Sequence, residues 1–141
     1  LEKVDELMPN TDIFIGCAAV SDFKPSHYYE NKIKKEDLNV VDLELKKNKD
    51  ILSHVAKVYK SSYIVGFAAE TKNVKENARK KLLNKNLNMI ISNDVSDKSI
   101  GFDSDQNEIN IITKSESIFL KKDKKIRIAR EILKIISLNI N

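Results

Sequence analysis

Residues 63–69, with the sequence YIVGFAA, are the stretch that decides the fold of this chain. They form a continuous apolar run, which is typical of a strand that is buried on both faces. Similar runs lie at residues 13–20 (IFIGCAAV) and 89–92 (MIIS). Because such runs belong to sheets covered by helices on both sides, we expect three neighbouring strands of a parallel sheet in an α/β fold.

The segments between these runs show the spacing of helices. Asn48 and Asp50 can cap a helix, and the positions i, i+3, i+4 and i+7 that follow are Leu52, Val55, Ala56 and Tyr59. A second helix is expected from Thr71 to about Leu87. Short connections of this kind predict right-handed crossovers, so the carboxyl ends of the strands share one edge of the sheet, where ligands bind.

The remaining segments predict additions to this sheet. Residues 39–47 alternate apolar and charged side chains, which indicates a strand with one wet face that leaves the main sheet. Residues 108–113 and 117–120 are expected to form a hairpin. A last helix should follow, with an inner stripe of Ile126, Ala129, Leu133 and Ile136.

Composition limits the class of protein. The chain has 141 residues and 41% hydrophobic residues, enough for one core, and its 25 basic and 21 acidic residues leave a net charge of +4. This balance permits nucleic-acid binding without indicating it, and no apolar run is long enough to span a membrane. The single cysteine, Cys17, excludes an internal disulfide and is typical of the cytoplasm.

Small residues mark the ends of two expected strands, as Gly16-Cys17-Ala18-Ala19 and Gly66-Phe67-Ala68-Ala69. Their missing side chains let a ligand approach backbone N–H groups, or they allow close packing of a helix. The cluster of residues 32–35 (KIKK) is either a phosphate clamp or a solvated turn. From the residues alone, we expect a domain that binds an anionic or nucleotide ligand.

Two further patterns are not interpreted as sites from the residues alone. Lys81 and Lys85 share one helical face, which we expect to point into solvent, away from Leu83 and Leu87. No metal site is expected, because the two histidines are far apart and the calcium-like string at residues 103–107 lacks the glycine and glutamate of a calcium loop.

Five strings, in this order and spacing, resemble the phosphopantothenate-cysteine ligases, also called phosphopantothenoylcysteine synthetases. The resemblance covers residues 13 to about 112 and is closest to the bacterial type, often fused behind a flavin-dependent decarboxylase. The strings are AAVSDFKP (18–25), KIKK (32–35), LKKNKDIL (45–52), VGFAAET (65–71) and NDVS (93–96), the last followed by Gly101-Phe102.

The resemblance implies a Rossmann-like, three-layer parallel sheet with a projecting antiparallel segment used for homodimerisation. It also implies a reaction of coenzyme A biosynthesis, in which the carboxylate of 4'-phosphopantothenate attacks the α-phosphate of CTP to give an acyl-cytidylate and pyrophosphate. The amine of L-cysteine then displaces CMP. Mg²⁺ would accompany CTP, and FMN would belong only to a fused decarboxylase domain outside this chain.

Site residues are implied by the same resemblance. Lys32 is the catalytic candidate, on a loop that closes over the acyl-cytidylate, and Ala19 lies beside the reacting centre. Lys81 and Lys85 become phosphate contacts, which reverses the surface interpretation. The nucleotide-binding set as a whole is Gly16, Cys17, Ala18, Asp22, Lys32, Asn48, Lys49, Asp50, Ile51, Phe67, Lys81 and Lys85.

The sequence also departs from the family pattern. The familiar Asn-Pro-Asp turn is Asn48-Lys49-Asp50 here, and Ser21 replaces a usual alanine. The amino-terminal half of the ligase domain does not match these residues, so residues 1–141 are expected to be its carboxyl-terminal part, incomplete as an enzyme by itself. Two alternatives remain: a non-catalytic nucleotide-binding or regulatory module of the same fold, and a nucleic-acid-binding domain supported only by a pI near 9.0.

Overall fold

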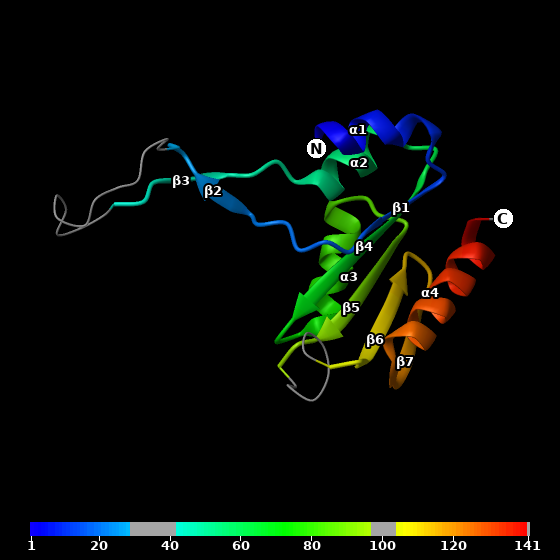
Figure 1. The fold of residues 1–141 in the computed structure, drawn as a ribbon. Coiled ribbons are helices and arrows are strands. Elements are labelled where there is room, and N and C mark those ends of the chain that lie inside the picture. The colour runs from blue at the N-terminus through cyan, green and yellow to red at the C-terminus, as the bar shows by residue number, and fades with distance from the viewer. Residues whose placement is uncertain (29–41, 97–103, 141) are drawn as a thin grey trace.

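A five-stranded sheet forms the centre of the molecule (Figure 1). The structure, a computed structural model, describes residues 1–28, 42–96 and 104–140. The strand order is β1-β4-β5-β6-β7. The bounds of these strands are β1 Ile13–Gly16, β4 Tyr63–Glu70, β5 Met89–Asp94, β6 Gln106–Thr113 and β7 Ser117–Lys124.

The three strands predicted from apolar runs are parallel neighbours, as expected. Ile15 of β1 pairs with Val65 of β4, and Val65 pairs in turn with Met89 of β5. The predicted hairpin is also confirmed, because β6 and β7 are antiparallel to each other and β6 is antiparallel to β5. The sheet is therefore mixed, and its parallel part is limited to β1, β4 and β5.

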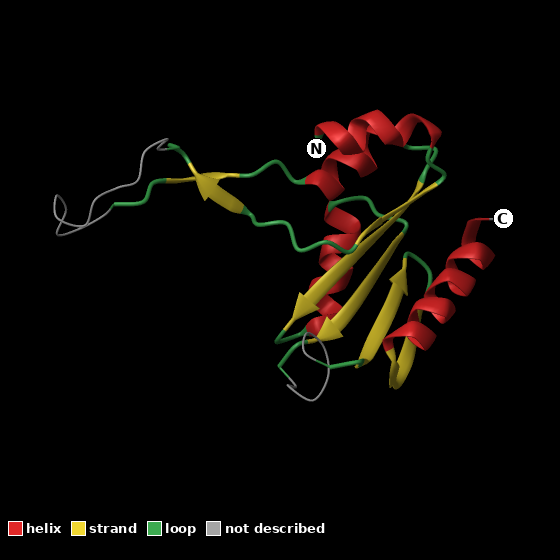
Figure 2. Ribbon diagram, viewed as in Figure 1, coloured by secondary structure: helices red, strands yellow, loops and turns green. Residues whose placement is uncertain are grey.

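Helices cover both faces of the sheet, which confirms the three layers (Figure 2). On one face lie α1 (Glu2–Leu7), the 3₁₀ turn Met8–Asn10, α2 (Ile51–Val58) and α3 (Val74–Asn84), around a core that includes Val55, Leu82 and Ile90. On the other face α4 (Lys125–Ile140) packs against Val65, Met89 and Ile111. A hydrogen bond adds to this packing, since His54 Nε2 of α2 lies 2.7 Å from Asp5 Oδ1 of α1.

The predicted inner stripe of the last helix is wrong at three of its four positions. The buried side chains of α4 are Ile128, Ile132 and Ile136, whereas Ile126 and Leu133 are more than half exposed and Ala129 is exposed. The helix carries apolar residues on two adjacent stripes, and both have helical periodicity. Periodicity alone could not decide which of the two stripes faces the sheet.

The first strand is shorter and less buried than predicted. It ends at Gly16 rather than Val20, and Ile13 is 37% exposed, because β1 is the edge strand of the sheet among the described residues. After Gly16 the chain leaves the sheet, so Cys17, Ala18 and Ala19 are exposed.

A two-stranded antiparallel ribbon projects from the body of the molecule (Figure 1). It consists of β2 (Phe23–Pro25) and β3 (Leu45–Lys47), so the strand predicted over residues 39–47 is limited to its last three residues in the described part of the chain. Residues 39–41 lie outside the described residues. Phe23, Leu43 and Leu45 are each more than half exposed on this projection.

No helix among the described residues is long and apolar enough to cross a membrane.

Candidate functional site

A cavity of about 1010 Å³ lies at the carboxyl ends of β1 and β4, which is the edge that the parallel strands predicted for a ligand. Gly16 and Ala69 come from the ends of these strands, and Asn93 comes from β5. The start of α2 and two lysines near the end of α3 complete the wall. The site is therefore built from segments that are far apart in the sequence.

The glycines at the small-residue ends of the two strands have different roles. The segment Gly16-Cys17-Ala18-Ala19 lines the cavity, so its backbone is accessible to a ligand. Gly66 is buried instead, and a Cβ placed there would lie 2.8 Å from Leu52 Cδ2 and 2.9 Å from Leu87 Cδ1. At Gly66 the missing side chain allows close helix packing, which was the alternative interpretation of this pattern.

Asn48 joins two of the strings that carried the family resemblance. Its side-chain Nδ2 donates a hydrogen bond to the backbone oxygen of Ser21 (2.7 Å), and its backbone N–H donates to that of Asp22 (2.8 Å). Asp22, Asn48 and Asp50 all line the cavity. These bonds fix the turn before α2 against the segment that follows β1, although the proline of the familiar turn is absent.

Asp50 caps α2, and it is one of the two cap candidates that the sequence offered. Its Oδ1 accepts a hydrogen bond from the Ser53 N–H (3.0 Å), its Oδ2 accepts one from Ser53 Oγ (2.8 Å), and Lys85 Nζ lies 2.7 Å from Oδ2. Burial by itself would raise the pKa of Asp50, but the hydrogen bonds from Lys85 and Ser53 outweigh it and lower the pKa to about 2. The carboxylate is therefore charged at neutral pH.

We expect Asp50→Ala to lower the free energy of unfolding by about 1 kcal/mol at pH 7, because the first turn of α2 loses its cap. The folded-state pKa of Asp50 is depressed, so its stabilisation is complete above the unfolded pKa near 3.8 and is lost as the pH falls through about 2. Denaturant unfolding at pH 7, 4, 3 and 2 measures the difference between wild type and variant, which should shrink toward pH 2. Asp42→Ala, at an exposed position, is the control, and an equal effect there would contradict the cap.

Lys81 and Lys85 both line the cavity, and Lys81 is also exposed to solvent, as its helical spacing predicted. Lys81 Nζ lies 2.6 Å from Glu70 Oε1, and Lys85, with a side chain only 29% exposed, pairs with Asp50. Two ammonium groups on one wall of a cavity suit an anionic ligand. The positive end of the α2 dipole, whose first residues line the same cavity, acts in the same direction.

The structure brings together the site residues implied by the family resemblance, with one exception. Lys32 lies outside the described residues. The members of the set that line the cavity are Gly16, Cys17, Ala18, Ala19, Asp22, Asn48, Lys49, Asp50, Ile51, Phe67, Lys81 and Lys85.

The polar residues of the cavity wall that had no assigned role in the sequence analysis include Asn93, Asn107 and Lys125. Asn93 opens the string NDVS, which carried the resemblance but no function. Asn107 stood in the rejected calcium-like string, and Lys125 stands at the junction of β7 and α4. The position of Asn93 at the end of a parallel strand was the available signal.

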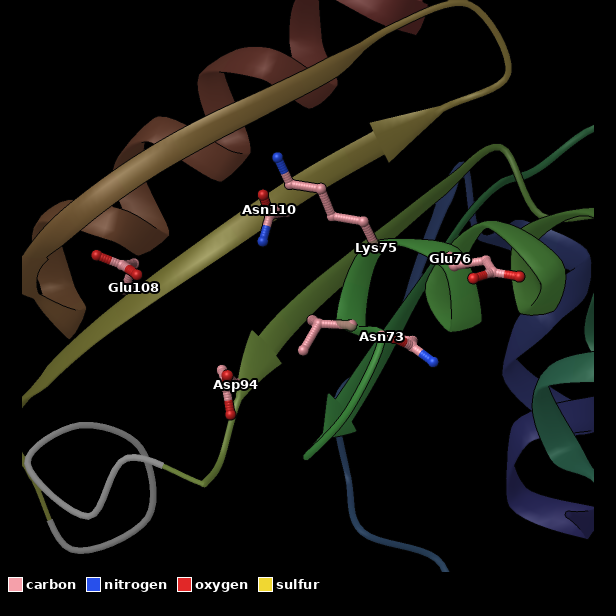
Figure 3. Close-up of a pocket in the computed structure, with 7 residues that line it drawn as sticks. Asn73, Lys75, Glu76, Asp94, Glu108 and Asn110 are labelled. Atoms are coloured by element: carbon pink, nitrogen blue, oxygen red, sulfur yellow. The ribbon is translucent and has the colours of Figure 1, made fainter.

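A second pocket of about 450 Å³ lies at the amino end of α3 (Figure 3). Lys75 extends from α3 toward β6, and its Nζ lies 6.0 Å from the centroid of the Phe119 ring. Three carboxylates, those of Glu76, Asp94 and Glu108, line this pocket. Because they would repel a polyphosphate, the larger cavity is the candidate site.

Comparisons with known proteins agree with this architecture. The family model described as "DNA/pantothenate metabolism flavoprotein C-terminal domain" matches residues 1–139. The coenzyme A biosynthesis bifunctional protein CoaBC of Borreliella burgdorferi is 41% identical over 127 residues, which are 89% of this chain and 32% of that protein. CoaBC of Bacillus subtilis is 42% identical over 113 residues, which are 80% of this chain and 28% of that protein.

A crystal structure of the C-terminal domain of CoaBC has a similar fold, with a TM-score of 0.76 and 35% sequence identity. The match covers 97% of this chain and 59% of that one. The chain therefore spans about a third of the length of these curated relatives and 59% of the crystallised C-terminal domain. By its sequence and its Rossmann-like fold, the chain belongs to the family of the DNA/pantothenate metabolism flavoprotein C-terminal domain.

Proposed function

We propose that the protein carrying this chain is a phosphopantothenate-cysteine ligase that uses CTP in coenzyme A biosynthesis. The observation that carries the proposal is that Lys81, Lys85 and the small-residue segment after β1 all line the same cavity. The relatives support the pathway, since CoaBC is named for coenzyme A biosynthesis and the family for pantothenate metabolism. Because this chain covers only part of those proteins, it supplies part of the site.

The proposed reaction has two steps. A carboxylate oxygen of 4'-phosphopantothenate attacks the α-phosphorus of CTP, the bond to the β-phosphate oxygen breaks, and pyrophosphate leaves. The cysteine amine then attacks the carbonyl carbon of the acyl-cytidylate. The amine loses a proton, the bond to the phosphate oxygen breaks, and CMP leaves with that electron pair.

The residues of the cavity suit distinct parts of this reaction. The ammonium groups of Lys81 and Lys85 neutralise the polyphosphate, and the backbone of Gly16, Cys17 and Ala18 approaches the nucleotide. The carboxylate of Asp22 and the ring of Phe67 would hold the nucleoside. The turn Asn48-Lys49-Asp50-Ile51 contacts the nucleotide, Ala19 leaves room beside the reacting centre, and Lys32 closes the site against water.

Mg²⁺ fits this proposal as a companion of the triphosphate. The described residues contain no group of three or more histidine, cysteine or carboxylate side chains able to hold a metal, so the phosphates would supply most of the ligands. The ion would neutralise charge on the departing pyrophosphate. FMN belongs to the proposed decarboxylase part of the parent, outside this chain.

We also propose that the protein is a homodimer in the cytoplasm. The exposed apolar side chains of Phe23, Leu43 and Leu45 on the projecting ribbon support the second copy as a partner. That these residues are the carboxyl-terminal part of a ligase domain, whose amino-terminal half lies outside them, stays a prediction. In the alternative function, the same cavity binds a nucleotide but catalyses no reaction.

Pyrophosphate release by the protein carrying this chain separates the two functions. A ligase releases pyrophosphate from CTP only when phosphopantothenate is present, whereas a binding module binds CTP and releases none. Calorimetry with CTP alone shows that the protein is folded and competent to bind. Binding without pyrophosphate release would favour the module.

Both wall lysines contribute to nucleotide affinity in this proposal. We expect Lys81→Ala and Lys85→Ala each to raise the Kd for CTP about tenfold, because each removes a charged hydrogen bond of roughly 1.5 kcal/mol. Isothermal titration calorimetry measures the effect. Lys80→Ala is the matched control, since Lys80 pairs with Glu76 on the same helix and does not line the cavity. An equal loss in Lys80→Ala would mean that only net charge matters.

A further inference from the structure

Glu70 is a carboxylate beside the cavity that the proposed reaction does not use. It is the last residue of β4, and its side chain is only 15% exposed. It is not among the described residues that line the cavity, whereas Lys81 is. Glu70 Oε1 accepts a hydrogen bond from Lys81 Nζ at 2.6 Å. Glu70 therefore reaches a ligand in this cavity only through Lys81.

The Glu70 carboxylate is itself held in place. Asn77 Nδ2 lies 3.4 Å from Glu70 Oε2, and the same amide donates a hydrogen bond to the backbone oxygen of Lys72 at 3.0 Å. The backbone oxygen of Glu70 accepts a hydrogen bond from the Val95 N–H at 3.0 Å. Because both carboxylate oxygens have a donor, the group is a fixed anchor rather than a mobile surface acid.

A fixed partner reduces the conformational freedom that Lys81 would lose on binding a ligand. Its side chain is 49% exposed and has a flexible four-carbon stem, which loses rotamer freedom when the ammonium binds a phosphate. The ammonium has three donors, and the bond to Glu70 uses one of them. The other two stay available for a phosphate, while the amine is already at the cavity wall before the ligand arrives.

The nearby pair of Lys80 and Glu76 provides the contrast. Their charged atoms are 2.8 Å apart, but both side chains are about two-thirds exposed and neither lines the cavity. An exposed pair on the helix surface holds its lysine weakly. Glu70, by comparison, is mostly buried and joins β4 to α3.

We propose that Glu70 is a positioning residue that fixes the Lys81 ammonium at the wall of the nucleotide cavity. The identity of the ligand rests on the proposed function, but the fixing of the amine does not. A carboxylate that acted only by its negative charge would weaken binding of an anion. Glu70 instead strengthens it, by preorganising its cationic partner.

The first test uses the protein carrying this chain without nucleotide. We expect Glu70→Gln to speed the acetylation of Lys81 by about twofold to fivefold, as measured by peptide mass spectrometry, because the amine is no longer held by a charged acceptor. Acetylation of Lys80 should stay constant in this variant, and Glu76→Gln should leave both rates almost unchanged, because the exposed Lys80–Glu76 pair holds its lysine weakly. Unchanged Lys81 reactivity would overturn the proposal.

The second test is a double-mutant cycle on CTP affinity. Glu70→Gln should raise the Kd for CTP about threefold to tenfold in the wild-type background and less than about twofold in Lys81→Ala. Glu70→Asp keeps the charge but withdraws the carboxylate, so it should weaken binding as Gln does. Tighter binding in Glu70→Gln, or an equal loss in the Lys81→Ala background, would overturn the proposal.

The two tests also separate this proposal from the proposed function. If the wild-type protein failed to bind CTP, the nucleotide proposal would fail, while the acetylation rates would still decide whether Glu70 holds Lys81. Thermal unfolding of each variant shows whether the fold is intact. The Glu70→Asp variant, which keeps the charge but withdraws the carboxylate from Lys81, provides the result if Glu70→Gln does not fold.

Discussion

Lys32→Ala should lower the turnover of the protein carrying this chain by about a hundredfold to a thousandfold, which corresponds to about 2.7 to 4 kcal/mol of transition-state stabilisation. Negative charge on the α-phosphate oxygens is redistributed as the carboxylate attacks, and a fixed cation there stabilises the transition state more than the ground state. Lys32 is assigned from the family resemblance of the string KIKK and lies outside the described residues. Its effect should be larger on kcat than on the Kd for CTP.

The control for Lys32 comes from the same string. Lys35→Ala removes an equal charge three residues away and should leave kcat within a few-fold of wild type. Steady-state kinetics with CTP, phosphopantothenate and cysteine measures both variants. Equal losses in the two variants would mean that the string acts by general charge, and unchanged turnover in Lys32→Ala would remove its catalytic role.

Leu82→Ala should lower the stability of the sheet by about 2 to 5 kcal/mol, because it leaves a cavity in the core. Leu82 is fully buried between α3 and the sheet, in the cluster that contains Ala78, Leu87 and Ile90. Hydrogen exchange of the β4 and β5 amides in the protein carrying this chain measures the local free energy of opening. The loss should appear in both strands.

The adjacent leucine is a matched control for this prediction. Leu83 is 59% exposed, so Leu83→Ala should change the opening free energy by no more than about 0.5 kcal/mol. Equal effects of the two substitutions would show that α3 has a different rotation about its axis. That result would also move Lys81, the residue before Leu82, away from the cavity.

The features of the fold that depend on local sequence were predicted correctly. The apolar runs identified β4 and β5 and their parallel pairing, and the cap of α2 is Asp50, one of the two candidates that the sequence offered with Asn48. These features depend on side chains within one turn or one strand. The predicted carboxyl edge of the parallel strands is where the cavity lies, so its place in the fold could be predicted before its lining residues were known.

Features that depend on distant neighbours were missed. β1 is less buried than its composition suggested because it lies at the sheet edge, and α4 carries two apolar stripes of equal periodicity. Leu83 was used as a marker of the buried side of α3, whereas Leu82 is the buried residue and Leu83 is exposed. The partner of Lys81 comes from β4, and helical spacing within α3 contains no information about it.

The central claim is that this cavity belongs to an enzyme that activates phosphopantothenate as an acyl-cytidylate. Mass spectrometry of the protein carrying this chain, incubated with CTP, Mg²⁺ and 4'-phosphopantothenate, tests it most directly. Without cysteine, the proposal predicts the acyl-cytidylate and pyrophosphate; with cysteine, it predicts 4'-phosphopantothenoylcysteine and CMP. A folded protein that binds CTP but forms neither the acyl-cytidylate nor the cysteine adduct would contradict the claim.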